Sequence, residues 1–188
     1  MNRVKELIQE HLDVIQNIFD NDIEKIIKIS DLVNECLSKG FKLIFIGNGG
    51  SASDAQHLSA EFVGRFQKER NPLPAISLST DTSAITAIGN DYGFDRIFER
   101  QINALASPGD ILFAISTSGN SPNIIEGIKA ATNKGCVVIG LLGKTGGEAK
   151  NLCDECIIID HHATARIQEG HIMVGHIICS LNDVEFKK

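Results

Sequence analysis

The sequence predicts a doubly wound α/β fold, in which a five-stranded parallel sheet is flanked by helices. After Gly40, short apolar runs alternate with Gly/Ser-rich loops and helical segments, a pattern typical of parallel strands buried on both faces. No internal repeat, low-complexity tract or Pro-rich linker divides the 188 residues, of which 43% are hydrophobic. We therefore expect one domain over residues 1–188, with helices in 1–38 and the α/β core in 39–188.

Two amphipathic helices are expected first, over residues 3–19 and 22–38. Apolar residues there recur three or four positions apart, so one face of each helix is apolar. Asn21 or Asp22 would cap the second helix, and Gly40 would end it.

Strands and helices are expected to alternate over the rest of the chain. The expected strands are 42–46, 75–78, 111–115, 137–142 and 157–159. The expected helices are 52–66, 82–105, 122–134, 146–151 and 162–184. Ligands of such sheets bind at the carboxyl ends of the strands, so the loops after the first three strands are candidate binding segments.

The loop at residues 47–51 reads GNGGS, follows a strand and opens a helix. Backbone N–H groups and the helix dipole there favour an anion, and the glycines permit close approach. The loop lacks the Lys-Ser/Thr ending of a P-loop and the full GxGxxG spacing, which disfavours nucleotides. A plain Gly-rich connection is the alternative.

The loop at residues 116–122 reads STSGNSP and places four hydroxyls before a proline suited to the first turn of a helix. Hydroxyl and N–H groups bind phosphate without fixed positive charge, which suits a sugar phosphate that must exchange readily. The alternative is that these Ser and Thr residues only cap the helix that begins at Pro122.

Candidate chemical groups lie on two helices. His57 and Glu61 are four residues apart and project from one face, a spacing that suits a metal ion. Gln168, His171 and His176 lie among apolar residues of the last helix, where polar groups need partners. Each histidine alone is more typical of a hydrogen-bonded core or interface residue than of a ligand.

The spacing of Gln168 and His176 limits how one metal ion can be bound. They are eight residues apart, about 12 Å along a straight helix, so one ion can hardly be reached by both. If both bind one ion together with His57 and Glu61, they come from different subunits and the site lies at an oligomer interface.

Two polar residues near these segments are further candidates. Asp91, in a turn-like stretch after the second strand, would hydrogen-bond sugar hydroxyls or serve as a plain turn residue. Arg65, one turn beyond Glu61, would pair with Glu61 or with substrate.

Composition argues against several partners. A formal charge of −6 without any Lys/Arg cluster disfavours nucleic acid. Residues 1–30 contain no readable signal peptide or membrane span, so no membrane partner and a cytoplasmic location are expected. The five cysteines are odd in number and are expected to be reduced, and the CxxC pair Cys153 and Cys156 is only half of a four-ligand zinc site.

Four motifs together resemble one known family. In chain order they are GNGGSASDAQHLSAEFVGRF, AIGNDYGF, ISTSGNSPN and ARIQEGHIMVGHI. They resemble the sedoheptulose 7-phosphate isomerases, or phosphoheptose isomerases, of the SIS-domain superfamily. The resemblance spans nearly the whole chain, and the paired N-terminal helices resemble the oligomerisation helices of that family.

The resemblance implies conversion of D-sedoheptulose 7-phosphate to D-glycero-D-manno-heptose 7-phosphate, the first step toward nucleotide-activated heptose for lipopolysaccharide or capsule. It also implies a homotetramer with active sites shared between subunits. Carried onto matching positions, the substrate-binding residues would be Asn48, Gly49, Gly50, Glu61, Asn90, Asp91, Ser116, Thr117, Ser118, Ser121 and Gln168. The zinc ligands would be His57, Glu61, Gln168 and His176.

Aldose–ketose isomerisation fits these residue types. A base must take a proton from the carbon beside a carbonyl and return it to the neighbouring carbon. Glu61 is the expected base and His176 the expected acid or relay at the oxygens. A metal ion or polar contacts would stabilise the enediolate. Ala165 departs from the family pattern, because some relatives carry aspartate there.

Two other functions compete with the isomerase. Some SIS proteins that resemble this family bind the replication initiator and are not known as isomerases, but the retained metal-ligand positions argue against that function. A sugar-phosphate-sensing regulator usually carries a separate DNA-binding domain, for which the chain has no room beyond its helical N-terminus. The isomerase is therefore the favoured hypothesis.

Overall fold

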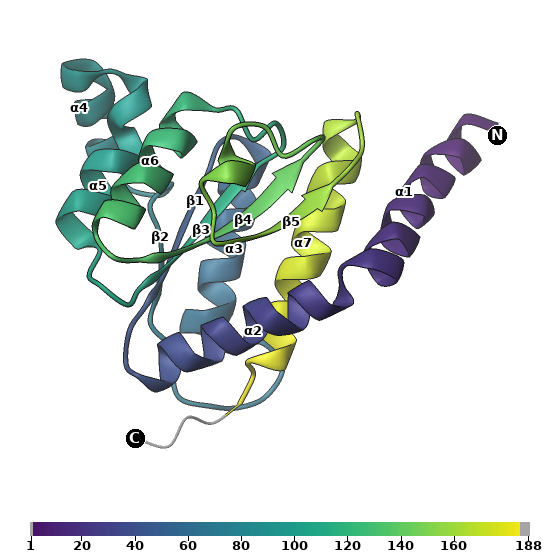
Figure 1. Ribbon diagram of the computed structural model, residues 1–188, viewed down its shortest axis with the longest axis horizontal. Helices are drawn as coiled ribbons and strands as arrows, with labels where there is room; N and C mark the ends of the chain where they lie inside the picture. The colour runs from purple at the N-terminus through teal and green to yellow at the C-terminus, as the bar shows by residue number, and fades with distance from the viewer. Residues whose placement is uncertain (1, 185–188) are drawn as a thin grey trace.

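The computed structural model describes residues 2–184, in which helices and strands alternate after two initial helices (Figure 1). The helices are α1 (Asn2–Asn21), α2 (Ile23–Ser38), α3 (Gly50–Val63), α4 (Thr82–Tyr92), α5 (Ile97–Leu105), α6 (Pro122–Asn133) and α7 (Thr164–Leu181). The strands are β1 (Leu43–Gly47), β2 (Ala75–Ser77), β3 (Ile111–Ser116), β4 (Val137–Gly143) and β5 (Glu155–Ile159). The 3-10 helices η1 (Phe94–Arg96) and η2 (Ala149–Asn151) complete the elements.

The strands form one parallel sheet in the order β2-β1-β3-β4-β5. The register places Leu43 of β1 opposite Ala75 of β2 and Ile111 of β3. Every residue of β1 and β3 is buried, which explains why their apolar residues follow one another without alternation up to the polar Ser116 that ends β3. The predicted doubly wound five-stranded parallel sheet flanked by helices is confirmed.

Helices cover both faces of the sheet, and each face has its own apolar core (Figure 1). Phe45 of β1 points into the core formed with α1, α2, α3 and α7. Its neighbours Ile44 and Ile46 point into the opposite core, formed with α5 and α6. This alternation follows from the two-residue period of a strand. The sheet thus holds α3 and α7 together on one face.

The two N-terminal helices lie close to their predicted bounds. Asp22 occupies the position before α2, but its carboxylate bonds Lys25 and caps no backbone amide among the described residues. Gly40 has a φ of +81° and follows the end of α2, as predicted. α1 extends away from the sheet (Figure 1) and exposes the apolar side chains Val4, Ile8, Leu12 and Phe19.

Two predicted helices are wrong in their extent. The helix predicted over 82–105 is broken at Gly93, whose φ of +92° ends α4 before η1 and α5 begin. The helix predicted over 146–151 is reduced to η2, because Gly146 and Gly147 also have positive φ. Glycine adopts this backbone region readily and other residues rarely do.

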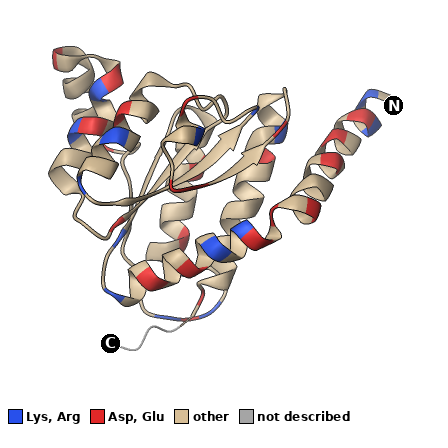
Figure 2. Cartoon of the chain, in the orientation of Figure 1, with Lys and Arg blue, Asp and Glu red and all other residues tan. Residues whose placement is uncertain are grey.

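The surface and the thiols agree with the composition. Positive and negative side chains are intermixed along α2 and around α5 (Figure 2). All five cysteines are free, and burial raises the pKa of Cys36, Cys153 and Cys179 to about 12. Across residues 2–184, no helix combines the length and apolar character needed to cross a bilayer.

Candidate active site

The carboxyl ends of β1 and β3 lie at the switch point of the sheet, where a binding crevice is expected. The two strands are neighbours, but the helix after β1 leads to β2 and the helix after β3 leads to β4, in opposite directions. In sheets of this order, ligands bind where the connections diverge. The loops at 47–51 and 116–122 therefore flank the crevice. Asn48 and Asn123 join them through two side-chain hydrogen bonds of 2.9 and 2.8 Å.

Glycines shape the loop after β1. Gly49 has a φ of +54°, so a larger residue there would be strained. A Cβ at Gly50 would overlap the side-chain amide of Gln168, so this glycine lets Gln168 reach the amino end of α3. The first N–H groups of a helix have no partner within it and favour anions. Asn48, Gly49 and Gly50 thus lie in one loop, and the Gln168 side chain lies against Gly50.

The loop after β3 presents hydroxyl groups on a fixed backbone. The Ser116 and Ser118 hydroxyl oxygens accept hydrogen bonds of 3.1 Å from the amides of Gly119 and Asn120. A Cβ at Gly119 would clash with the Gly146 carbonyl, so the loop after β4 supports this loop directly. Within the described residues Ser121 makes no capping hydrogen bond, so the capping alternative does not explain its hydroxyl.

Asn90 and Asp91 lie on the last turn of α4, and the turn-like stretch predicted for Asp91 is therefore wrong. Both residues are exposed, and the Asn90 amide donates to the Asp91 carboxylate at 2.8 Å. α4 follows β2, so its first residue lies at the same edge of the sheet as the loops after β1 and β3. In residues 2–184 no hydrogen bond joins either side chain to those loops.

A second group of polar side chains lies between α3 and α7, and we call it the His57–Glu61–His176 cluster. The Nε2 atoms of His57 and His176 are 2.9 Å apart, and His57 Nε2 lies 3.6 Å from Glu61 Oε1. The helices approach closely because Gly175 lacks a side chain: a Cβ there would lie 2.6 Å from Cδ2 of Leu58. The predicted pairing of His57 and Glu61 on one helix face is confirmed.

Gln168 is separated from this cluster within one chain. It contacts Gly50, whereas His57 and Glu61 lie about 10 and about 16 Å further along α3. His176 lies about 12 Å from Gln168 along α7. The structure therefore brings three of the four predicted metal ligands together and leaves the fourth at the loop after β1.

The cluster contains donor types that bind zinc, namely two imidazole nitrogens and a carboxylate. In the described part of the chain, no three His, Cys, Asp or Glu side chains are already arranged around a metal position. The His57 and His176 nitrogens are at hydrogen-bond distance, whereas two nitrogens on one tetrahedral zinc lie about 3.4 Å apart. The donor set fits zinc in kind and requires a small opening of the histidine pair.

Two residues of the site region were missed in the sequence. Asn123 is buried and orients Asn48, and its place after Pro122 in a first helical turn was the available signal. Asp54 lies one turn before His57, with its Oδ2 buried and unpartnered among the described residues. Burial raises the pKa of the Asp54 carboxyl, while His57 opposes that shift.

His171 and Arg65 have roles outside the cluster. His171 is fully buried, and its Nε2 lies 2.8 Å from the Leu142 carbonyl oxygen, as expected for a core histidine. Burial lowers its pKa to about 4, although the hydrogen bond to Leu142 opposes the shift. Arg65 follows the end of α3 and lies 3.6 Å from Glu69 instead of pairing with Glu61, and its alternative contact with substrate stays a prediction.

The fold and the crevice define a protein of the sugar isomerase class. The family model described as "SIS domain" matches residues 6–143, which is more than half of the chain.

Individual relatives agree on the branch of this class. The chain is 52% identical over 182 residues to the phosphoheptose isomerase of Nitratiruptor sp., covering 97% of each protein. It is 54% identical over 168 residues to that of Nitratidesulfovibrio vulgaris, covering 89% of this chain and 81% of the relative. The solved phosphoheptose isomerase of Neisseria gonorrhoeae superimposes with a TM-score of 0.92 at 42% identity, covering 97% of this chain and 98% of that one. The chain belongs to the phosphoheptose isomerase family of SIS-domain proteins.

Proposed function

We propose that the protein isomerises D-sedoheptulose 7-phosphate to D-glycero-D-manno-heptose 7-phosphate. The observation that carries this proposal is the His57–Glu61–His176 cluster. In it, His57 Nε2 lies 2.9 Å from His176 Nε2 and 3.6 Å from Glu61 Oε1. Relatives named phosphoheptose isomerases support the substrate class. The product would lead to nucleotide-activated heptose for lipopolysaccharide or capsule.

The crevice would hold the substrate from its phosphate end. The hydroxyls of the loop after β3, together with the amino end of α6, suit a phosphate group. Those residues are Ser116, Thr117, Ser118 and Ser121. The sugar hydroxyls would be bound by Asn48, Asn90, Asp91 and Gln168, with Gly49 and Gly50 permitting close approach.

The chemistry would be a proton transfer between neighbouring carbons. Glu61 takes the proton from C1, beside the C2 carbonyl, and returns it to C2. His176 donates a proton to the C2 oxygen and accepts one from the C1 oxygen, so no net proton is consumed. His57 lies between them and hydrogen-bonds His176, which fixes the orientation of that ring.

Zinc is the proposed cofactor. His57, Glu61 and His176 would hold it, and the amide of Gln168 from another subunit would complete the set. Bound zinc supplies Lewis-acid stabilisation of the negative charge that develops on the enediolate oxygens.

The position of the cluster favours an active site shared between subunits of a homotetramer. Glu61 lies about 16 Å along α3 from the loop that would bind substrate in the same chain. We therefore propose that the loops of one subunit meet the cluster of another. The exposed apolar side chains of α1, and a groove of about 540 Å³ beside them that includes Leu7 and Glu169, support α1 as part of the interface.

Conversion of sedoheptulose 7-phosphate by purified, zinc-replete protein, followed by proton NMR of the sugar, tests the proposal. Glu61→Gln is expected to lower kcat by about 10³-fold, because the amide cannot accept the proton. Glu69→Gln is the matched control, since Glu69 is 90% exposed and lies outside the cluster. The absence of conversion by a folded wild-type oligomer would contradict the isomerase and favour a binding protein.

A further inference from the structure

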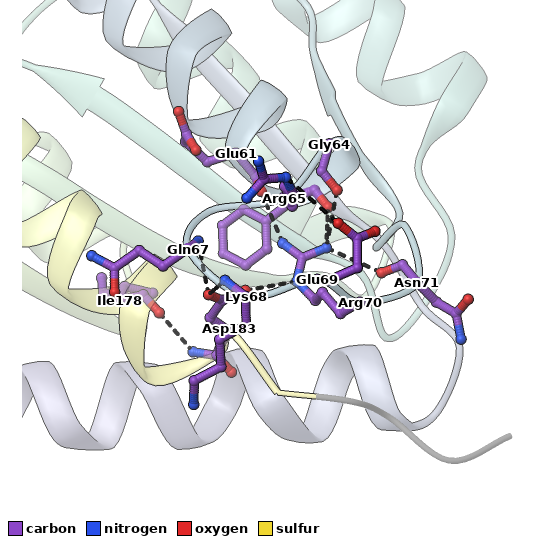
Figure 3. A network of polar contacts seen from close by, with 12 residues as sticks. Glu61, Gly64, Arg65, Gln67, Lys68, Glu69, Arg70, Asn71, Ile178 and Asp183 are labelled. Carbon is purple, nitrogen blue, oxygen red and sulfur yellow. Dashed lines mark hydrogen bonds and ion pairs between the residues drawn. The ribbon is translucent and has the colours of Figure 1, made fainter.

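Arg70 and Asp183 form a buried ion pair beside the His57–Glu61–His176 cluster. Their side chains are only 3% and 2% exposed, and Arg70 Nε donates to Asp183 Oδ1 at 3.1 Å (Figure 3). Burying two charges costs desolvation energy, so such a pair is weak evidence for stability by itself. The groups that the pair contacts indicate a more specific role.

Arg70 binds the carboxyl end of α3. Its guanidinium donates to the carbonyl oxygens of Glu61 and Phe62, each at 2.9 Å. The last carbonyls of a helix have no partner within the helix, so an external donor fixes them. The guanidinium is therefore hydrogen-bonded to the backbone of the proposed base itself (Figure 3).

Asp183 follows α7 and holds the segment that leaves α3. Its Oδ2 accepts hydrogen bonds from the amides of Gln67 and Lys68, at 2.9 and 2.6 Å (Figure 3). Burial by itself would raise the pKa of the Asp183 carboxyl, but the hydrogen bonds from Lys68, Gln67 and Arg70 outweigh burial and lower the pKa. Asp183 is therefore a carboxylate at neutral pH.

The segment held by Asp183 also reaches the second helix of the cluster. Phe66 directly precedes Gln67, and its ring lies 5.6 Å from the His176 ring, between centroids. One carboxylate therefore fixes a ring that packs on His176, and its arginine partner fixes the backbone of Glu61. Both proposed proton-transfer residues are thus connected to the same ion pair.

We propose that Arg70 and Asp183 are positioning residues that set the placement of Glu61 relative to His176. The proposal rests on the isomerase function proposed above. Misplacement of a reacting group by about 1 Å can cost about 100-fold in rate, so loss of the pair lowers turnover even in a protein that remains folded.

Asp110 provides a matched control. Its side chain is also 2% exposed, and it also accepts two backbone hydrogen bonds and one ion pair, from Lys42 and Ser107. These partners lie outside α3 and α7. Asp110→Asn therefore removes a comparable buried charge without touching either helix of the cluster.

The experiment compares Asp183→Asn with Asp110→Asn. Both are expected to lower the urea midpoint of unfolding. Asp183→Asn is expected to lower kcat at least about tenfold with KM changed less than about twofold, and Asp110→Asn to keep kcat within about twofold. Equal kcat losses in the two variants, or full kcat in folded Asp183→Asn, would overturn the proposal. If Asp183→Asn does not fold, Arg70→Lys is compared with Lys42→Arg, because both keep the charge and change its geometry. Lys42 is 30% exposed and Arg70 only 3%, so this comparison uses kcat and not stability.

A second readout is independent of turnover. The imidazole NMR signals of His57 and His176 are expected to shift in Asp183→Asn and to stay in place in Asp110→Asn. A wild-type protein that converts no sugar would contradict the proposed function, and the imidazole comparison would still decide the positioning role. Unmoved signals in folded Asp183→Asn would refute that role.

Discussion

The Nε2 atoms of His57 and His176 lie 2.9 Å apart, although 119 positions separate the two histidines in the chain. A neutral imidazole has one N–H and one acceptor nitrogen, so one ring donates and the other accepts. Glu61 lies 3.6 Å from His57 on the same helix. A carboxylate and two imidazoles are thus joined in one row across the contact between α3 and α7, an arrangement able to hold and pass a proton.

Removal of Asn123 is expected to weaken substrate binding. Asn123→Ala leaves the Asn48 side chain without either of its inter-loop hydrogen bonds, so the loop after β1 loses its fixed position. Asn48 is half-buried, so its unpaired amide costs about 1 kcal/mol, which corresponds to a KM increase of about fivefold if the cost falls on the substrate complex. Steady-state kinetics of the wild-type and Asn123→Ala proteins measure the change in KM. Asn133→Ala, at the exposed end of the same helix, should leave KM unchanged, and an equal rise there would contradict the explanation.

Metal content tests the donor role of the cluster directly. We expect purified protein to retain about one zinc per subunit and His57→Ala to lose most of it, because one imidazole donor is removed. Elemental analysis of dialysed protein gives the zinc content per subunit without any activity assay. His162→Ala is the control, since His162 is exposed and stacks on His161 away from the cluster. Equal zinc in the two variants would exclude His57 as a ligand.

Close packing at Gly175 predicts a loss of stability on substitution. Gly175→Ala would place a methyl group 2.6 Å from Cδ2 of Leu58, so the buried Leu58 side chain must shift or α3 and α7 must separate, at a cost of about 1–3 kcal/mol. Gly89→Ala is the matched helical control: its nearest neighbour would be 3.9 Å away, and alanine should stabilise that helix by about 1 kcal/mol. Urea unfolding of both variants provides the free energies. A Gly175→Ala protein as stable as wild type would show that the helix contact is not tight.

His171 predicts a dependence of stability on pH. Its pKa is lowered to about 4 in the folded protein, against about 6.5 in an unfolded chain. The unfolded state therefore binds the extra proton first, and the free energy of unfolding falls as pH decreases from about 6.5 to about 4, by about 3 kcal/mol. Urea unfolding across this range should show a smaller fall in His171→Gln than in wild type. Identical pH slopes in the two proteins would contradict this account.

The strands were predictable because burial on both faces leaves an unambiguous signal. β1 and β3 contain uninterrupted apolar runs, with Ser116 the polar last residue of β3, and their observed bounds differ by one residue from the expected ones. The binding loops followed from the same reasoning, because polar Gly/Ser segments after parallel strands must meet at one edge of the sheet. The family resemblance supplied the residue roles that spacing alone left open.

The remaining features depend on contacts between distant segments. Helical periodicity continues through Gly93, and only the positive φ adopted in the folded chain ends α4 there. The pairing of Asn48 with Asn123 requires the strand order, which a local pattern does not contain. The distance between His57 and His176 depends on how α7 slides along α3, and the contact of Gly175 with Leu58 fixes that position.

The long separation of His57 from His176 in the chain also bears on the order of folding. Contacts between distant segments form slowly, because a long loop must close, at a cost in entropy, before the contacts stabilise the chain. A refolding intermediate with β1 paired to β3 but with α7 still undocked would have both loops that flank the crevice and no histidine pair. The proposed phosphate-binding loops and the proposed proton-transfer residues would then form at separate times as the chain refolds.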